Sequence, residues 1–183
     1  TSWISIIYVQ RFREIYFAVF KGNDQFARGF WQEATQFYTK SLDICPLIYT
    51  ATYLSNRAAA YIKLKDWERA ISDCSQALEI GALNDKPLER RAYCYAQQEE
   101  KYEQAIEDYQ SLLKLYPGKK NIYEDKINSL KRSVDERNER MKKEMMSKLK
   151  DLGNMCLRPF GLSTDNFQLT QQPGGGYSIS MKK

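Results

Sequence analysis

The 183-residue chain contains no histidine. Histidine is the commonest general base of enzymes and a frequent metal ligand, so Ser-His and Cys-His catalytic pairs and mixed Cys/His zinc sites are excluded. The four cysteines stand at positions 45, 74, 94 and 156 without C-x-x-C spacing, and we expect reduced, intracellular thiols. No glycine-rich phosphate loop or paired-carboxylate motif stands out. The sequence therefore predicts no metal, no cofactor and no enzyme.

The chain also lacks a long uninterrupted hydrophobic run. Its most apolar stretch, TSWISIIYVQRFREIYFAVF, is broken by Arg11, Arg13 and Glu14, well short of the ~20 apolar residues that span a bilayer. The stretch has neither the basic start nor the small-residue cleavage site of a signal peptide. We therefore expect no membrane insertion and a cytoplasmic location, with the 43% apolar content forming a core.

Three similar blocks recur in the first two thirds of the chain: FWQEATQFYTKSL, DWERAISDCSQAL and KYEQAIEDYQSLL. Their key alanines, Ala34, Ala70 and Ala105, are spaced 36 and 35 residues apart. A second helical stretch precedes each block: FKGNDQFARG, LSNRAAAYIKL and LERRAYCYAQQ. Alanine on a buried helix face has almost no side chain to bury, so another helix must come very close. The pattern predicts three successive helix–turn–helix units.

These blocks resemble the tetratricopeptide repeat (TPR) family, whose 34-residue unit has small residues where its two helices cross. Gly22, Ala58 and Ala92 occupy that position in the first helices, and Trp67 is expected to fill the space at a following turn. The resemblance implies an all-α fold, a TPR superhelix of three helix–turn–helix repeats at about 15–48, 51–84 and 85–119. Residues 1–14 would form an atypical N-terminal segment.

The resemblance also implies a peptide-binding groove lined by the first helices. Many TPR co-chaperones use a two-carboxylate clamp that holds the C-terminal Glu-Glu-Val-Asp tail of Hsp70 or Hsp90. Carried over residue by residue, the clamp consists of Asn23, Asn56, Lys86 and Arg90. Lys86 and Arg90 are four residues apart and can share one helix face. The alternative is that all four are ordinary solvated, packing or capping residues.

One position departs from the clamp motif. The family's first-unit lysine lies one helical turn before the asparagine, and here that position is Val19. Lys21 is close in sequence, but a residue two positions away points to a different side of a helix. We therefore expect a clamp that is short of one positive charge and binds more weakly.

A long amphipathic helix is predicted at 120–150, followed by a tail at 151–183. Apolar residues recur at threes and fours from Tyr123 to Leu149, which indicates a helix that caps the third repeat. Between 118 and 150 there are eleven Lys or Arg and six Asp or Glu, an interspersion typical of a solvated face, so no nucleic-acid partner is expected. The tail is expected to pack through its apolar residues, which are Leu157, Pro159, Phe160, Leu162 and Phe167.

Two functions are compatible with these features. The first is a non-enzymatic adaptor or co-chaperone that binds the acidic C-terminal peptide of Hsp90 or Hsp70, as the TPR resemblance implies. The second is a signalling scaffold that engages a folded partner such as a GTPase through the repeat edges, the long helix or the tail. The oligomeric state is left open by the sequence.

Overall fold

The computed structural model describes residues 3–44, 47–81, 85–171 and 176–182. By its internal contacts the chain divides into two compact units, residues 1–134 and 135–183. The first unit carries the helical repeats, and the second carries the end of a long helix and the C-terminal tail. The two units are described in turn.

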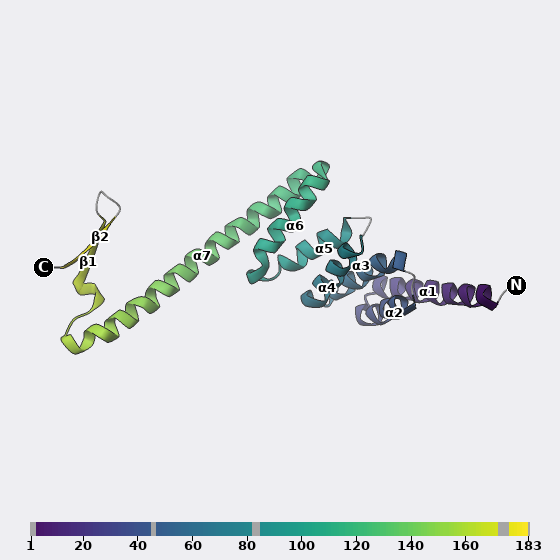
Figure 1. The fold of residues 1–183 in the computed structure, drawn as a ribbon, viewed down its shortest axis with the longest axis horizontal. Helices are drawn as coiled ribbons and strands as arrows, with labels where there is room; N and C mark the ends of the chain where they lie inside the picture. Colours follow the sequence, from purple (N-terminus) through teal and green to yellow (C-terminus); the bar gives the residue numbers. More distant parts are fainter. Residues whose placement is uncertain (1–2, 45–46, 82–84, 172–175, 183) are drawn as a thin grey trace. The chain divides into compact units, whose positions relative to one another are not determined.

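The first unit is built from helices that follow one another as pairs (Figure 1). Helices α1 and α2 pack against each other, as do α3 with α4 and α5 with α6, while α2 also contacts α3 and α4 contacts α5. This is the architecture predicted from the three repeated blocks. The helices are α1 (Trp3–Ala27), α2 (Trp31–Ile44), α3 (Leu47–Lys63), α4 (Trp67–Glu79), α5 (Lys86–Tyr95) and α6 (Tyr102–Leu115).

Small residues lie where the helices cross, as predicted. Ala34, Ala58, Ala70, Ala92 and Ala105 are completely buried. Their missing side-chain volume lets two helix backbones approach closely, which larger residues would prevent.

In the first repeat the same position is a glycine. A Cβ added at Gly22 would lie 2.8 Å from Cε1 of Tyr38, closer than two carbon atoms can approach without a shift. Position 22 therefore has no room for a side chain unless Tyr38 moves. In the second repeat, Trp67 packs against the cluster that contains Ala58 and Tyr61, as expected from the sequence.

Helix α1 is longer than the other first helices and is only partly covered. Ile15 and Ala18 are buried on the side of α2, whereas a row of large apolar side chains is 51–75% exposed: Val9, Phe12, Tyr16, Phe17 and Phe20. Across the described residues, no helix is long and apolar enough to cross a membrane. The aromatic start of the chain therefore forms an amphipathic helix with one exposed apolar face.

Helix α7 (Lys120–Leu157) begins after a short 3-10 turn at Pro117–Lys119. Its buried residues in the first unit, Tyr123, Ile127 and Leu130, join the apolar cluster of α6. The ring of Tyr123 stacks on that of Tyr109 with centroids 6.1 Å apart. The first part of α7 thus caps the third repeat, as its amphipathic pattern predicted.

The second unit combines the end of α7 with a β-hairpin. Strands β1 (Phe167–Gln171) and β2 (Tyr177–Met181) pair antiparallel, with Phe167 opposite Met181. Polar contacts connect the tail to the helix: Asn154 Oδ1 accepts hydrogen bonds from the Thr164 backbone N–H at 2.6 Å and from Thr164 Oγ1 at 2.8 Å. The hairpin was not predicted from the sequence.

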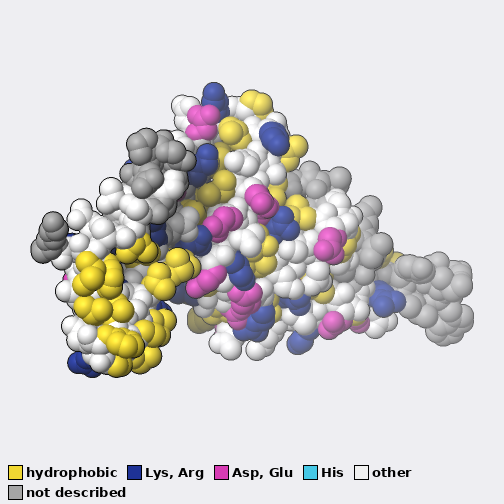
Figure 2. Space-filling view, turned by 60° about the vertical axis from the view of Figure 1, so that its left-hand side comes forward, with side chains coloured by type: hydrophobic (Ala, Val, Ile, Leu, Met, Phe, Trp, Pro, Cys, Tyr) yellow, Lys and Arg dark blue, Asp and Glu magenta, His cyan; other side chains and the backbone are white. Residues whose placement is uncertain are grey.

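The prediction that the tail packs through its apolar residues is wrong for Pro159, which is exposed, and for Phe160, which is 76% exposed. Gly161 follows it with a φ of 72°, a left-handed conformation that reverses the chain without side-chain strain. Figure 2 shows hydrophobic side chains gathered near the C-terminal part of the chain, at the lower left of the view. The large exposed apolar residues of this unit include Met141, Met145, Leu149, Leu152 and Met155.

The buried alanines generate a stability prediction. Ala58→Leu and Ala70→Leu should each lower the free energy of unfolding by about 1–3 kcal/mol, because the added methylene groups have no space where the helices cross. Thermal and denaturant unfolding followed by circular dichroism measure the loss. The matched control is Ala27→Leu at an exposed position of α1, which should change stability little, and equal shifts for all three variants would contradict this packing.

Candidate functional site

The four residues expected to form the clamp lie on the three first helices. Asn23 is on α1, Asn56 on α3, and Lys86 and Arg90 are on α5. Asn23 and Lys86 are exposed, while Asn56 and Arg90 are half-buried. Lys86 is the first residue of α5 and lies one helical turn before Arg90.

Arg90 reaches from α5 to the backbone of α3. Its Nη1 donates to the backbone carbonyl of Ser55 at 2.6 Å and to Ser55 Oγ at 2.5 Å. Burial lowers the pKa of the Arg90 guanidinium from its ordinary value, and the nearby Cys74, Tyr38 and Glu89 offset part of that effect. A half-buried guanidinium held by neutral oxygens retains its positive charge, and it can attract an anion.

Tyr38 of α2 connects this arginine to the first helix. Its Oη donates to Asn23 Oδ1 at 2.8 Å. Burial raises the pKa of the Tyr38 phenol, and the positive charge of Arg90 acts in the opposite direction. Asn23 is therefore held by a buried tyrosine of α2, and Ser55, the residue to which Arg90 donates, immediately precedes Asn56.

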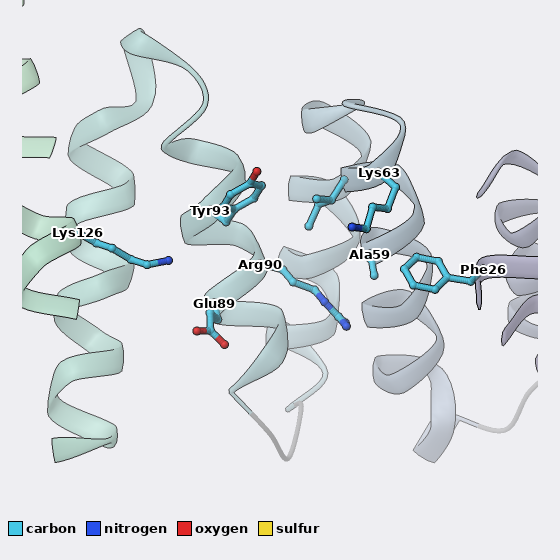
Figure 3. A pocket seen from close by; sticks show the side chains of 8 residues that line it. Phe26, Ala59, Lys63, Glu89, Arg90, Tyr93 and Lys126 are labelled. Carbon is cyan, nitrogen blue, oxygen red and sulfur yellow. The ribbon is translucent and has the colours of Figure 1, made fainter. Parts of the chain in front are cut away.

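A cavity of about 340 Å³ adjoins Arg90 on the side of the first helices (Figure 3). Apolar parts of its lining come from α1, α3 and α5, and charged side chains add three cations and one carboxylate. Because α7 also supplies a lining residue, four helices contribute to one cavity. Its lining residues are Phe26, Ala59, Ile62, Lys63, Glu89, Arg90, Tyr93 and Lys126.

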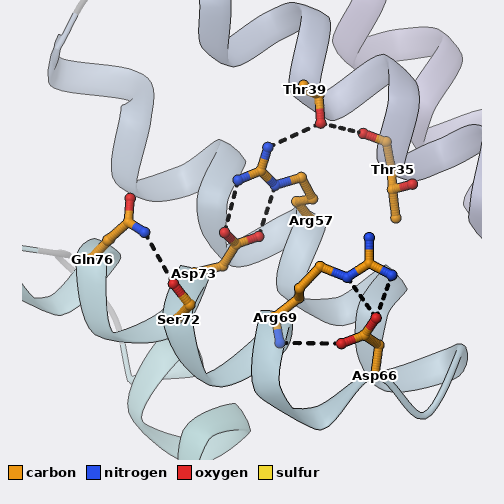
Figure 4. Close-up of polar contacts among 8 residues, drawn as sticks. All are labelled: Thr35, Thr39, Arg57, Asp66, Arg69, Ser72, Asp73 and Gln76. Carbon is orange, nitrogen blue, oxygen red and sulfur yellow. Dashed lines mark hydrogen bonds and ion pairs between the residues drawn. The ribbon is translucent and has the colours of Figure 1, made fainter.

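Polar side chains hold the first helix of the second repeat in place (Figure 4). Arg57 donates through Nε and Nη2 to the two carboxylate oxygens of Asp73, both at 2.8 Å, and through Nη1 to Thr39 Oγ1 at 2.9 Å. These bonds join α3 to α4 of the same repeat and to α2 of the preceding one. The hydrogen bond to Asp73 raises the pKa of Arg57, so the guanidinium is charged at neutral pH.

The third repeat has the same arrangement. Arg91 donates to both carboxylate oxygens of Asp108 at 2.8 Å, and its Nη1 lies 3.2 Å from Ser75 Oγ of the preceding repeat. Arg57 and Arg91 are thus equivalent residues, each joining three helices. Because Arg90 and Arg91 are adjacent on α5, the Arg91 network also orients the helix that carries Arg90.

Three residues of this site were not identified from the sequence. Tyr38 stands four residues after Ala34, at the aromatic position of the repeated block, so a pattern marked it as a core residue but not as a partner of Asn23. Ser55 is a small residue beside a predicted clamp residue, and its contact with Arg90 bridges 35 positions. Lys126 lies on the capping helix, where no motif distinguishes it from other lysines.

Comparisons with known proteins agree with this architecture. Residues 88–119 match the family model of the tetratricopeptide repeat. Sperm-associated antigen 1 of Rattus norvegicus is 43% identical over 97 residues, which is 53% of this chain and 10% of that protein. The chain therefore spans about a tenth of the length of that curated relative.

Solved structures of TPR domains are also similar. The first TPR of Spaghetti (RPAP3) bound to the Hsp90 peptide SRMEEVD has a TM-score of 0.58 and 29% identity, covering 67% of this chain and 97% of that chain. The second TPR domain of human RPAP3 in complex with the Hsp70 peptide SGPTIEEVD has a TM-score of 0.58 and 26% identity, covering 66% and 98%. Both similarities extend over most of the solved domain.

The arginine–aspartate pairs generate a second stability prediction. Arg57→Ala should lower the free energy of unfolding by about 3 kcal/mol, because it leaves the Asp73 carboxylate, only 3% exposed, without its charged partner. The control is Arg69→Ala, which removes an exposed ion pair with Asp66 and should change stability much less, because solvent screens that pair. Urea unfolding compares the two variants, and equal costs would show that the Arg57 pair does not hold the repeats together.

Proposed function

We propose that the chain, with its tetratricopeptide-like repeats, is a non-enzymatic adaptor that binds the acidic C-terminal peptide of Hsp90 or Hsp70. The peptide would lie against the first helices of the three repeats. Asn23, Asn56, Lys86 and Arg90 would hold the two carboxylates of its last residue. Two asparagine amides, an ammonium and a guanidinium supply only hydrogen-bond donors and positive charge to such a group.

The observation that carries this proposal is the environment of Arg90. Its guanidinium is half-buried, bonds to the neutral oxygens of Ser55 and makes no ion pair within the described part of the chain. A carboxylate that reached it would form a charge-assisted hydrogen bond in a partly dry setting, worth about 1.5–3 kcal/mol. Arg57 and Arg91, by contrast, already bind Asp73 and Asp108.

Peptide chemistry in the similar structures supports the same ligand class. The peptides bound to the two RPAP3 domains both end in Glu-Glu-Val-Asp. A main-chain carboxylate and an aspartate side chain at the last residue lie close together, so one cluster of donors can contact both. The free C-terminus of the ligand is therefore the chemical feature that this site would recognise.

Arg90→Ala should weaken binding of an Hsp90 or Hsp70 tail peptide by about 2–3 kcal/mol, because a carboxylate loses its charged partner. Lys86→Glu should be more severe, since it adds repulsion. Isothermal titration calorimetry measures the affinities, and circular dichroism checks that each variant is still helical. Arg69→Ala is the matched control, because it removes an arginine from the exposed face of α4. Undiminished binding by a folded Arg90→Ala variant would remove the clamp.

A substitution at Val19 tests whether peptide binding can be strengthened. Val19 is half-buried on α1, one turn before Asn23, so a lysine there could extend toward the carboxylate that Asn23 contacts. Val19→Lys should tighten binding of the acidic peptide by about 1 kcal/mol, or roughly fivefold, and salt should reduce the gain.

The control for Val19→Lys is the same peptide with an amidated C-terminus. This peptide lacks the main-chain carboxylate, so the added lysine should help it far less. An equal gain for both peptides would indicate general electrostatic attraction instead of a clamp. No gain for either would show that α1 does not contribute to the binding groove as proposed.

A further inference from the structure

The cavity beside Arg90 is lined by basic side chains that form no ion pair with a described carboxylate. Lys63, Arg90 and Lys126 all line it, and none of the three forms an ion pair with another described residue. Several other arginines and lysines of the first unit are paired with carboxylates, among them Arg57, Arg91, Lys101 and Lys119. Three cations and one carboxylate, that of Glu89, therefore line this cavity, so its charge is net positive.

Lys126 lies on the capping helix α7, and its side chain contacts Tyr109 of α6. Its Nζ lies 3.4 Å from Tyr109 Oη and 5.0 Å from the centroid of the Tyr109 ring. Tyr109 is 2% exposed and stacks on Tyr123, so the surface that supports the ammonium is rigid. An ammonium fixed on an aromatic ring loses little further side-chain entropy when it binds an anion.

The direction of Lys126 brings it to the binding groove. In Figure 3 its side chain extends from α7 toward α5, where Glu89 and Arg90 lie, and Phe26 approaches from the opposite end of the cavity. Between these ends, Ala59, Ile62 and Tyr93 supply an apolar lining. The cavity thus has Lys126 at the side of α7, Arg90 and Tyr93 of α5 in the middle, and Ala59, Lys63 and Phe26 on the side of α3 and α1 (Figure 3).

We propose that Lys126 is a peptide-binding residue, which pairs with a side-chain carboxylate located upstream of the last residue of the bound peptide. This inference rests on the proposed function and adds the capping helix to the binding site. Its ligand is an extended peptide whose final carboxylates lie at Arg90 and whose next acidic side chain reaches Lys126. An apolar side chain of the same peptide covers Ala59 and Ile62.

Glu89 makes this second subsite selective. Its charge acts on Arg90, and it also acts on Lys119 and Tyr123 at the side of the capping helix. A carboxylate that approaches Glu89 would be repelled, whereas one that binds Lys126 on the side away from Glu89 gains an opposite charge. The groove should therefore favour acidic residues at defined positions over a uniformly acidic chain.

The test uses the peptide SRMEEVD and two versions in which one glutamate is replaced, SRMQEVD and SRMEQVD. Lys126→Met keeps an apolar stem on Tyr109 and removes the charge. It should weaken SRMEEVD by roughly threefold to fivefold, as expected for a partly exposed ion pair. For the peptide whose contacted glutamate is now glutamine, the same variant should show no further loss.

Lys131→Met is the matched control, because it removes the same charge from an exposed position of α7 outside the cavity. Lys126→Arg should restore the affinity, which distinguishes a charge contact from a purely structural effect. Calorimetric titrations with the three peptides measure these differences, and thermal unfolding monitors the fold.

The outcomes separate this inference from the proposed function. Equal losses for all three peptides, or equal effects of Lys126→Met and Lys131→Met, would overturn the Lys126 contact while leaving the clamp in place. Native chain that does not bind SRMEEVD would overturn the proposed function and, with it, this inference. A loss that is specific to Lys126 and vanishes with one glutamine peptide supports the contact and identifies the glutamate.

Discussion

The close approach of helix backbones at small residues is the constraint on which the rest of this structure depends. Fully buried alanines occupy both helices of the second and third repeats, and Gly22 lies so close to Tyr38 that no Cβ fits between them. Protein interiors are close-packed, so helices that meet at small residues must lie close together, because a larger separation would leave a void. The spacing and orientation of the first helices, and hence the groove, follow from this contact.

Charged groups then determine how the repeats join. Arg57 and Arg91 each bind an aspartate of their own repeat and a hydroxyl of the preceding repeat. Such bidentate pairs are geometrically specific, so they set the register of one repeat on the next. The first repeat has Lys21 and Phe37 at the corresponding positions, and its tyrosine, Tyr38, instead holds Asn23.

The candidate site contains an arginine, Arg90, that is not paired with a carboxylate of the described residues. Arg57 and Arg91 are neutralised by carboxylates, whereas Arg90, adjacent to Arg91 on the same helix, bonds to Ser55. One arginine therefore stabilises the repeat and its neighbour is available to an anion. Phe26, Ile62 and Tyr93 provide apolar surface beside it, so the cavity combines charge for orientation with burial for affinity.

The repeated pattern made the helical architecture predictable. Alanines at spacings of 36 and 35 residues indicated three helix pairs, and the periodic apolar residues after position 120 indicated the capping helix. Local periodicity decides these features, since each helix must present one apolar stripe to its neighbours. The four candidate residues Asn23, Asn56, Lys86 and Arg90 were assigned position by position from the resemblance to tetratricopeptide repeats, and their role in binding stays a prediction.

Contacts between distant residues could not be read from the sequence. Whether Arg90 binds a carboxylate or Ser55, and whether Lys126 faces the groove or the solvent, depends on where helices far apart in the chain come together. The alternating apolar residues of FQLTQ and YSISM are compatible with two strands, but which residues pair in the hairpin depends on the tertiary structure. The sequence by itself thus determined the helices, their order and their buried faces, and the tertiary structure alone decided which charges remain unpaired, because pairing requires proximity in space.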